Sequence, residues 1–455
     1  FKMGKNIKIP DNLISYNSRN LKGKICPPPD KSISHRALLI SSLAIGISKI
    51  QNLLESDDIL NTIKALRSLG VKIEKNIDGH WIINGVGLNG YAEPKGLLDC
   101  GNSGTLARIL IGAVSGNNIV ASFCGDESLS KRPMDRIIIP LEKMGATFVV
   151  ASGNTLPLTI KGTNDLLPIK YKSPISSAQI KTSILLASLN VRGVTEFEEP
   201  FTSRDHTELL LKKFGANIKF NSPINEKNFI SLEGGVNLKS CNIYVPADIS
   251  SASFSIVAAA ITPGSHIKLN NVCINHFRTG ILDALKRMGS NIIINKKNIN
   301  NSEEELADIE VKYSKLKGID LESTYSSRMI DEYPILSIAA AAAFGKTIFR
   351  GLNELKVKES DRFKAIIDGL KSCNIKVENK ENDIIIYGSA EEIKGGVKVN
   401  SNYDHRIAMS FLILGGVSQK PIEVSGCKSI LTSYPNFLKQ MNSIGLDIRG
   451  NEQKK

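Results

Sequence analysis

Basic side chains stand in this sequence at places where a helix is expected to begin. Cations in the first turn of a helix oppose its macrodipole, so they cost stability unless an anion lies among them. Six helix starts carry capping residues, and several of them add Lys or Arg. They hold Asp30, Lys31, Ser32 and Arg36; Asn102, Ser103, Gly104 and Arg108; Ser176, Ser177, Ala178 and Gln179; Asp248, Ser250 and Ser251; Asp331 and Glu332; and Asp404, His405 and Arg406. Capping explains the Asp and Ser residues, but the cations predict a centre that binds anions.

Two further charged segments extend this set. GDESLSKRPMDR (125–136) places Arg132 directly before a proline, and LKVKESDRFKAI (355–366) places Lys358, Glu359 and Arg362 around a helix start. Charge runs usually form solvated faces. Both segments, however, precede the second helix of a repeated unit, at the same end as the other helix starts. We therefore expect them to belong to the same anion-binding centre.

A repeated pattern, Leu-x-x-apolar-Gly-x-x-apolar, describes the helices that must position these residues. Its glycine position falls at 70, 145, 215, 289, 374 and 445, with Asn at 374 and Gly at the others. Each copy predicts an amphipathic helix that ends at a left-handed residue and is followed at once by a strand. Gly suits that conformation best and Asn second best.

A second, more apolar helix precedes each copy. Segments such as SGTLARILIGAVSG and YPILSIAAAAAFG have little polar face and are expected to be buried. With the β-rich runs between helices, one repeat reads strand–helix–strand–helix–strand–strand, and six repeats account for the length. The longest interval contains INKKNINNSEEEL (294–306), which we expect to be a solvated loop.

Proline-containing crossings divide the six repeats. Residues 27–29 are all Pro, and Pro246-Ala247 lies between the third and fourth repeats. Because proline stiffens the chain, we predict two domains of three repeats with the active site in a cleft between them. Residues 30–247 form one domain, and residues 1–29 with 248–455 form the other.

Composition excludes several classes of protein. The 455 residues are 42% hydrophobic and 23% charged, which is typical of a soluble globular protein. The longest apolar run, residues 335–344, is about half the length that crosses a bilayer. Seven scattered cysteines without a CxxC pair indicate reduced thiols, and six scattered histidines without HExxH argue against a metal site. No apolar signal segment is found near the N-terminus, so we expect the cytoplasm.

Net charge and short motifs raise alternatives. The balance of 58 basic and 45 acidic residues, +13, suggests anionic partners such as nucleic acid, a membrane surface or acidic metabolites. Nucleic-acid-binding modules interleave basic residues with aromatics, but aromatics are only 6% here. GVGLNG (85–90) matches the dinucleotide pattern GxGxxG without a following helix, and GKT (345–347) lacks the first glycine of a P-loop.

Eight segments resemble the 5-enolpyruvylshikimate-3-phosphate synthase family, in the family's order and spacing. They are DKSISHR (30–36), GNSGTLAR (101–108), SKRPMDR (130–136), SSAQIKTS (176–183), SRDHTE (203–208), DEYPIL (331–336), VKESDR (357–362) and DHRIAMSF (404–411). Three of them, DEYPIL, SRDHTE and DHRIAMSF, look like the bacterial class II branch. The resemblance implies the α/β enolpyruvyl transferase fold, an inside-out α/β barrel with two domains, each of three βαβαββ repeats.

The resemblance also implies a reaction: the enolpyruvyl group of phosphoenolpyruvate is transferred to the 5-hydroxyl of shikimate 3-phosphate, and phosphate is released. By motif, phosphoenolpyruvate would be bound by Lys31, Asn102, Gly104, Arg132, Arg362 and Arg406. Shikimate 3-phosphate would be bound by Lys31, Ser32, Arg36, Ser177, Ala178, Gln179, Arg204, Asp331 and Lys358.

The same resemblance implies the catalytic groups. Asp331 would act on the 5-hydroxyl proton and Glu359 on the carbon proton, with Lys31 as a cation and candidate acid. No metal or organic cofactor is implied. The expected partners are the two metabolites, not nucleic acid or membrane, and we expect a monomer.

Three positions depart from the family pattern. Pro29 stands where many relatives have Gly, so its backbone offers no N–H to a substrate. Ala178 replaces a serine that some members use for the shikimate phosphate, and Thr432 stands where some have a lysine. Gly104 stands where glyphosate-tolerant class II relatives tend to have Ala. We therefore expect glyphosate to compete with phosphoenolpyruvate.

The closest alternative shares the fold: the UDP-N-acetylglucosamine 1-carboxyvinyltransferase family. That family typically has a cysteine five positions before the Arg-Pro of a mobile loop, and Glu127 is there instead. The UDP-N-acetylglucosamine family also lacks the DKSISHR segment that this chain has at residues 30–36. An alternative of another class is a basic nucleic-acid-binding protein. Retention of DNA that is sensitive to salt, without enzymatic turnover, would favour that second reading.

Overall fold

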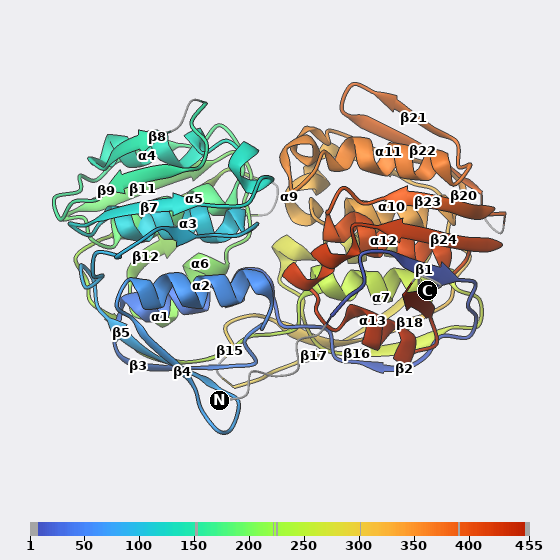
Figure 1. Ribbon diagram of the computed structural model, residues 1–455, viewed down its shortest axis with the longest axis horizontal. Coiled ribbons are helices and arrows are strands. Elements are labelled where there is room, and N and C mark those ends of the chain that lie inside the picture. The colour runs from blue at the N-terminus through green and yellow to red at the C-terminus, as the bar shows by residue number, and fades with distance from the viewer. Residues whose placement is uncertain are drawn as a thin grey trace, which may run out of the picture. The chain divides into compact units, whose positions relative to one another are not determined.

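The chain divides into two compact units in the computed structural model, which describes residues 8–150, 153–221, 223, 226–300, 302–389 and 392–450. The N-terminal unit comprises the described parts of residues 29–246 and 299–304. The C-terminal unit comprises those of residues 1–28, 247–298 and 305–455. In Figure 1 the first is coloured blue to green, and most of the second is yellow to red.

Three sheets and six helices make up the described part of the N-terminal unit. The elements are α1 (Lys31–Leu43), β3 (Ala44–Gln51), α2 (Asp57–Ser68), β4 (Lys72–Lys75), β5 (Trp81–Val86), β6 (Leu98–Asp99), α3 (Gly104–Ser115), β7 (Val120–Cys124), α4 (Asp135–Met144), β8 (Thr147–Val150), β9 (Leu158–Lys161), β10 (Lys170–Lys172), α5 (Ala178–Ser188), β11 (Val194–Glu199), α6 (His206–Lys213), β12 (Asn217–Phe220), β13 (Asn228–Glu233), β14 (Leu238–Lys239) and β15 (Asn242–Tyr244). The strand orders are β14-β3-β5-β4, with β15 also on β3, then β6-β7-β9-β8 and β10-β11-β13-β12.

The described part of the C-terminal unit repeats this plan. Its elements are β1 (Leu13–Tyr16), β2 (Lys22–Ile25), α7 (Ile249–Ile261), β16 (His266–Cys273), α8 (Gly280–Arg287), β17 (Asn291–Lys297), β18 (Leu306–Lys312), β19 (Asp320–Leu321), α9 (Ser326–Met329), α10 (Tyr333–Ala341), β20 (Phe344–Phe349), α11 (Arg362–Ser372), β21 (Val377–Lys380), β22 (Asp383–Ser389), β23 (Gly395–Asn400), α12 (His405–Gly415), β24 (Lys420–Ser425), α13 (Phe437–Ser443) and β25 (Asp447–Gly450). The strand orders are β17-β18-β16-β2, β19-β20-β22-β21 and β23-β24-β1-β25.

The six sheets share one topology. In each, one edge strand is parallel to its neighbour, as β6 is to β7, and the other neighbours in the strand order are antiparallel; β15 is a second parallel partner of β3. In four sheets a buried helix connects the two parallel strands directly, as α3 connects β6 to β7, and an amphipathic helix such as α4 follows; in the sheets of β3 and β16 the parallel edge strand comes from a distant part of the chain. The predicted six-fold strand–helix–strand–helix–strand–strand repeat is therefore confirmed.

Three sheets are completed by strands from distant parts of the chain. Strand β1 pairs with β24 and β25, and β2 pairs with β16, so the dark blue strands of Figure 1 lie among yellow and red ones. Strands β14 and β15 return to pair with β3 at the other end of the N-terminal unit. Each unit thus closes its repeats on one another.

The amphipathic helices end as the repeat predicts. The glycine position has a positive φ in all six copies, including Gly145 at 111° and Asn374 at 65°. The next residue donates its backbone N–H to the carbonyl of the repeat's first Leu or Met, as Ala146 does to Leu141 at 3.1 Å. This six-to-one bond satisfies a carbonyl at the helix end and turns the chain into the following strand.

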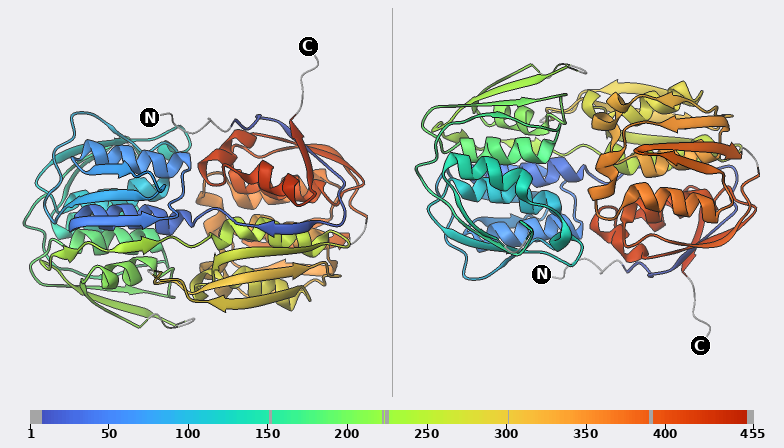
Figure 2. Two further views of the ribbon diagram at one scale, coloured as in Figure 1. Left: turned by 90° about the horizontal axis from the view of Figure 1, so that it is seen from below. Right: turned by 90° about the horizontal axis from the view of Figure 1, so that it is seen from above.

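The buried helices form the centre of each unit. Every residue of α7 is buried, and α10 and α12 are nearly as apolar, so they must pack against other elements on all sides. Helix α3 packs against α1 and α5, and α10 packs against α7 and α12. In each unit these helices run alongside one another with the strands outside them (Figure 2).

The expected solvated loop at residues 294–306 is wrong in two respects. Strand β17 continues through Lys297 and β18 begins at Leu306, so a hairpin occupies both ends of the segment. Its tip belongs to the N-terminal unit, where the Glu304 carboxylate lies 2.6 Å from Nδ1 of the buried His206. The polar composition of the tip therefore reflects buried polar contacts as well as exposure to solvent.

Candidate active site

The start of α1 carries the first predicted anion-binding residues. Asp30 caps the helix because its carboxylate accepts a hydrogen bond from the Ile33 N–H at 2.8 Å. The cap places Lys31 in the first turn, where its Nζ lies 2.7 Å from Oδ2 of Asp58 in α2. The lysine side chain remains 18% exposed, so it can reach a substrate from this position.

Arg36 joins the starts of three helices. Its guanidinium donates to Thr207 Oγ1 of α6 at 2.7 Å, to the Ser32 carbonyl at 3.1 Å, and to Thr182 Oγ1 of α5 at 3.0 Å. A further hydrogen bond reaches the Ala178 carbonyl at 3.4 Å. Because the side chain is buried, these contacts fix it in one position.

Arg204, on the segment between β11 and α6, lies next to this group. Its Nη1 donates to Oγ of Ser32 at 3.3 Å. Ser177 forms the N-cap position of α5, although its side chain makes no capping hydrogen bond. The predicted ligands Ser32, Arg36, Ala178 and Arg204 are therefore connected by direct contacts within the N-terminal unit.

A second group lies at the start of α3. Arg132 donates to Oδ1 of Asn102 at 2.9 Å. Arg108 donates to Oε1 of Gln179 at 2.8 Å, and Gln179 in turn donates to Oγ1 of Thr105 at 3.0 Å. These contacts bring the first turns of α3 and α5 together.

Gly104 separates two of these guanidinium groups. A Cβ at this position would lie 2.8 Å from Nη1 of Arg108 and 3.2 Å from Nη1 of Arg132. Both distances are shorter than an ordinary van der Waals contact. Glycine is therefore required here if both arginines are to keep their positions.

His35 links the helix starts as a neutral group. Its Nδ1 lies 2.8 Å from Thr62 Oγ1 of α2, and its Nε2 lies 3.4 Å from Oγ of Ser103, the N-cap of α3. Burial lowers the pKa of His35 well below its ordinary value, and Lys31 and Arg36 lower it further. The imidazole thus adds no charge to this end of the unit.

In the C-terminal unit the predicted residues surround Arg362. This side chain is fully buried, and its three nitrogens contact three carboxylates: Nε to Asp404 at 2.8 Å, Nη1 to Asp331 at 3.1 Å and Nη2 to Glu359 at 2.5 Å. Burial opposes the charged guanidinium, but Asp404, Glu359 and Asp331 outweigh it and raise its pKa. Arg362 therefore stays charged and holds both predicted catalytic carboxylates.

Asp331 has two more cationic neighbours. Lys358 Nζ lies 3.4 Å from its Oδ1, and Arg406 Nη1 donates to its backbone carbonyl at 3.2 Å. Asp404 caps α12 by accepting from the Arg406 N–H at 2.9 Å. The five predicted site residues of this unit thus lie together near the starts of α10, α11 and α12: Asp331, Lys358, Glu359, Arg362 and Arg406.

The chain matches a known protein family over most of its length. The EPSP synthase (3-phosphoshikimate 1-carboxyvinyltransferase) family profile matches residues 16–441. A 3-phosphoshikimate 1-carboxyvinyltransferase of Parvibaculum lavamentivorans is 45% identical over 97% of this chain and 98% of its own length. One from Zymomonas mobilis is 46% identical over 96% of each. The chain belongs to the EPSP synthase family.

Solved structures agree with this membership. An EPSP synthase from Acinetobacter baumannii superposes with a TM-score of 0.84 at 42% identity, covering 96% of this chain and 99% of the other. The enolpyruvyl transferase NikO from Streptomyces tendae, at 16% identity and a TM-score of 0.77, shares the fold. The expected α/β enolpyruvyl transferase fold is confirmed, and neither alternative function is favoured.

Several residues that contact the predicted site residues are not indicated by the sequence. Asp58 is one of them, because an acidic first turn is ordinary for a helix such as α2. Asp404 was read only as a helix start, although it also binds Arg362. At the start of α7, Asp248 provides the cap, and Ser250 contacts both Glu332 and Arg278. Such pairs join residues far apart in sequence, so no local pattern indicates them.

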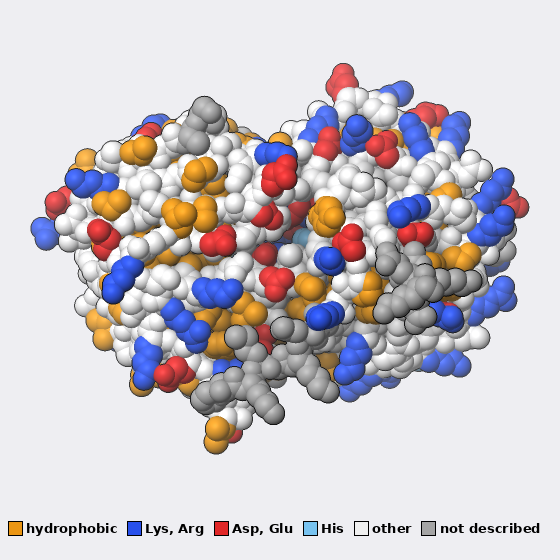
Figure 3. All heavy atoms as spheres, viewed as in Figure 1, with side chains coloured by type: hydrophobic (Ala, Val, Ile, Leu, Met, Phe, Trp, Pro, Cys, Tyr) orange, Lys and Arg blue, Asp and Glu red, His pale blue; other side chains and the backbone are white. Residues whose placement is uncertain are grey.

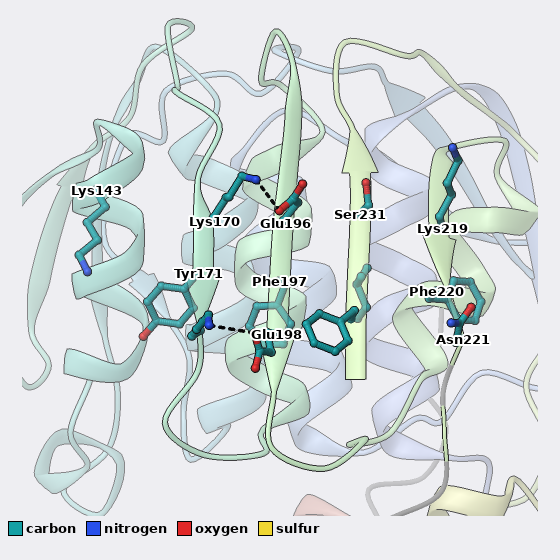
Figure 4. Close-up of a pocket in the computed structure, with 13 residues that line it drawn as sticks. Lys143, Lys170, Tyr171, Glu196, Phe197, Glu198, Lys219, Phe220, Asn221 and Ser231 are labelled. Carbon is teal, nitrogen blue, oxygen red and sulfur yellow. Dashed lines mark ion pairs between the residues drawn. The ribbon is translucent and has the colours of Figure 1, made fainter. Parts of the chain in front are cut away.

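A concave region outside these groups lies on the outer face of the β10–β13 sheet, and Figure 4 shows it. It has a volume of about 620 Å³ and contains none of the predicted site residues. Two of its four lysines pair with its two glutamates, Lys170 with Glu196 at 3.1 Å and Lys172 with Glu198 at 3.5 Å, and Lys143 lies over the ring of Tyr171.

On the face in Figure 3, Lys and Arg side chains are scattered and mixed with acidic ones rather than gathered in one stripe. Within the described residues, no group of three or more His, Cys, Asp or Glu could hold a metal ion. No helix in the same part of the chain has the length and apolar character to span a membrane.

Proposed function

We propose that the predicted residues at the helix starts of the N-terminal unit and those around Arg362 in the C-terminal unit act on one pair of substrates. The enzyme transfers the enolpyruvyl group of phosphoenolpyruvate to the 5-hydroxyl of shikimate 3-phosphate and releases phosphate. The observation that carries the assignment of roles is the buried guanidinium of Arg362, which holds Asp331 and Glu359 at once. A reaction with two proton transfers needs two such positioned groups.

The N-terminal unit is proposed to supply most of the anion binding. Shikimate 3-phosphate would contact Lys31, Ser32, Arg36, Ser177, Ala178, Gln179 and Arg204 there, and Asp331 and Lys358 in the C-terminal unit. Phosphoenolpyruvate would contact Lys31, Asn102, Gly104 and Arg132, with Arg362 and Arg406. The substrates carry carboxylates and phosphates, which guanidinium groups and helix N-termini bind well.

The proposed chemistry is addition followed by elimination. Asp331 removes the proton of the 5-hydroxyl as the hydroxyl oxygen attacks C2 of phosphoenolpyruvate, while Glu359, in its protonated form, delivers a proton to the methylene carbon. The tetrahedral adduct then expels phosphate as the resulting Glu359 carboxylate takes up one methyl proton, which restores the double bond. Lys31 stabilises negative charge on the phosphate, a role that its position beside the helix start supports.

Arg362 differs from an exposed substrate ligand because its guanidinium is buried among carboxylates. Its side chain is fully buried and its three nitrogens already contact carboxylates, so a contact with phosphoenolpyruvate would require the guanidinium or one of these carboxylates to move. Replacement of the Glu359 contact would release that carboxylate toward the substrate. Arg406 and Arg132 are then the guanidinium groups proposed to bind the phosphoenolpyruvate anion directly.

Release of phosphate from phosphoenolpyruvate, with and without shikimate 3-phosphate, tests this function. Release should require both substrates. Asp331→Ala or Glu359→Ala should slow turnover at least ~100-fold, the usual scale for a positioned acid or base. Asp368→Ala, on the exposed face of α11, is the matched control and should keep full activity. Release that ignores shikimate 3-phosphate, or no release, would overturn the proposal.

Two further expectations stay predictions. We propose a cytoplasmic enzyme, which fractionation of the source cells tests. We also propose a monomer, and sedimentation equilibrium of the purified chain should return the mass of a single copy, 49.6 kDa.

A further inference from the structure

A fully buried ion-pair cluster lies beneath the Arg204 segment. Lys181 of α5 has no exposed surface, and its Nζ lies 3.0 Å from Oε1 of Glu199 in β11 and 2.7 Å from Oε1 of Glu208 in α6. Burying charges costs several kcal/mol per ion before the pairing is counted, and apolar residues often serve stability as well. Stability alone is therefore a weak reason for this cluster.

The cluster binds every polar group of Ser203. The backbone N–H of Ser203 donates to Oε1 of Glu199 at 2.9 Å, and its hydroxyl lies 3.0 Å from Oε1 and 2.8 Å from Oε2 of the same carboxylate. Lys181 Nζ donates to the Ser203 carbonyl at 3.1 Å. Both peptide planes of Ser203 are thus fixed by the Lys181–Glu199 pair.

Ser203 immediately precedes Arg204. Fixing its carbonyl fixes the peptide plane that leads into Arg204, and hence the direction in which that side chain leaves the backbone. The Arg204 guanidinium then meets Oγ of Ser32 at the start of α1. A contact path therefore runs from the buried pair through one peptide to a predicted phosphate ligand.

The two carboxylates of the cluster are not equivalent. Burial acts to raise the pKa of Glu199, but Lys181 and the hydrogen bonds of Ser203 and Asn228 outweigh it, so this pKa is lowered. Glu208 contacts Lys181 without the hydrogen bonds that Ser203 and Asn228 give Glu199, and burial raises its pKa to about 7. Glu199 is therefore the permanent charge that fixes Ser203.

We propose that the buried Lys181–Glu199 pair is a positioning device for Arg204, acting through Ser203, and so sets the affinity for shikimate 3-phosphate. The inference rests on the proposed function, in which Arg204 contacts that substrate. Lys181 and Glu199 are positioning residues because they touch neither the substrate nor the reacting atoms in this arrangement.

A double-mutant cycle between Glu199→Gln and Arg204→Ala tests the proposal. The dissociation constant for shikimate 3-phosphate is measured by titration calorimetry, and kcat and both KM values by phosphate release. Arg204→Ala should weaken binding at least tenfold, the scale of a lost charge-assisted hydrogen bond. Glu199→Gln should weaken it roughly fivefold alone, with kcat and the KM for phosphoenolpyruvate within about twofold.

The decisive result is the combination. If Glu199 acts through Arg204, adding Glu199→Gln to Arg204→Ala should change the dissociation constant by less than about twofold. The matched control is Glu198→Gln, at the preceding residue of β11, whose side chain lines the groove on the outer face of the sheet; this variant should bind shikimate 3-phosphate normally. An equal loss in both backgrounds, or a loss of kcat with unchanged affinity, would overturn the proposal.

Two other outcomes are also informative. If Glu199→Gln does not fold, Ser203→Ala replaces it, because this change removes two contacts with Glu199 and leaves the buried charges paired. It should weaken binding about threefold, again only when Arg204 is present, and the same loss without Arg204 would refute the idea. Failure of the unmodified enzyme to bind shikimate 3-phosphate would instead refute the proposed function.

Discussion

Replacement of Gly104 by Ala should separate glyphosate binding from phosphoenolpyruvate binding. The new Cβ would lie 2.8 Å from Nη1 of Arg108, whereas ordinary contact begins near 3.4 Å, so the guanidinium must shift by about 0.6 Å. Arg108 is tied to Gln179 and to the Pro133 carbonyl, which resist that shift. Since a 1 Å misplacement can cost about 100-fold in rate, a shift of this size should cost roughly tenfold.

The assay is phosphate release at several concentrations of phosphoenolpyruvate and glyphosate. The unmodified enzyme should show competitive inhibition. Gly104→Ala should lower kcat/KM for phosphoenolpyruvate roughly tenfold and raise the inhibition constant for glyphosate by a larger factor than the KM for phosphoenolpyruvate. Gly96→Ala is the matched control, because a Cβ there meets nothing within 4 Å. Equal changes in both constants, or no inhibition of the unmodified enzyme at millimolar glyphosate, would refute the reasoning.

Three further changes test the fold and its charges. Asp404→Asn keeps the helix cap but removes a carboxylate from a buried guanidinium, so the free energy of unfolding should fall by about 3 kcal/mol in denaturant titrations. Glu208 should hold its proton in the folded state up to about pH 7, against 4.5 when unfolded, so stability should fall by about 3 kcal/mol as pH rises across that range. Glu208→Gln should flatten this slope, and an unchanged slope would count against the assignment. Asn374→Gly should raise the melting temperature slightly because φ is 65° there, whereas Asn374→Ala should lower it.

The repeat could be predicted because its signal is local. A leucine, a glycine four positions later and a strand directly after it form one continuous segment, and even Asn374 follows the rule. The pairing of β2 could not be predicted in the same way. Its sequence, KGKI, has a single buried residue, and its Lys22 pairs with His266 of β16, 244 positions later.

In the candidate site, too, some residues are indicated by local sequence and others are not. Residue types at helix starts indicated the cations, and the resemblance assigned their roles, which stay predictions. The acidic partners Asp58 and Asp404 depend on how helices pack, and so does the contact of Glu304 with His206. A polar segment in sequence gives no sign of whether water or a buried histidine will face it.

During synthesis on a ribosome, β1 is made early but must wait for its partner strand. Leu13 pairs with Val424, which is made 411 residues later, or roughly 20–80 s at 5–20 residues per second. Until then the short strand has no sheet to join, whereas the strands of the N-terminal unit are complete once β15 is made, 180 residues before Val424. We expect the N-terminal unit to fold first during translation, and the C-terminal unit to close only when its earliest strand meets its latest ones.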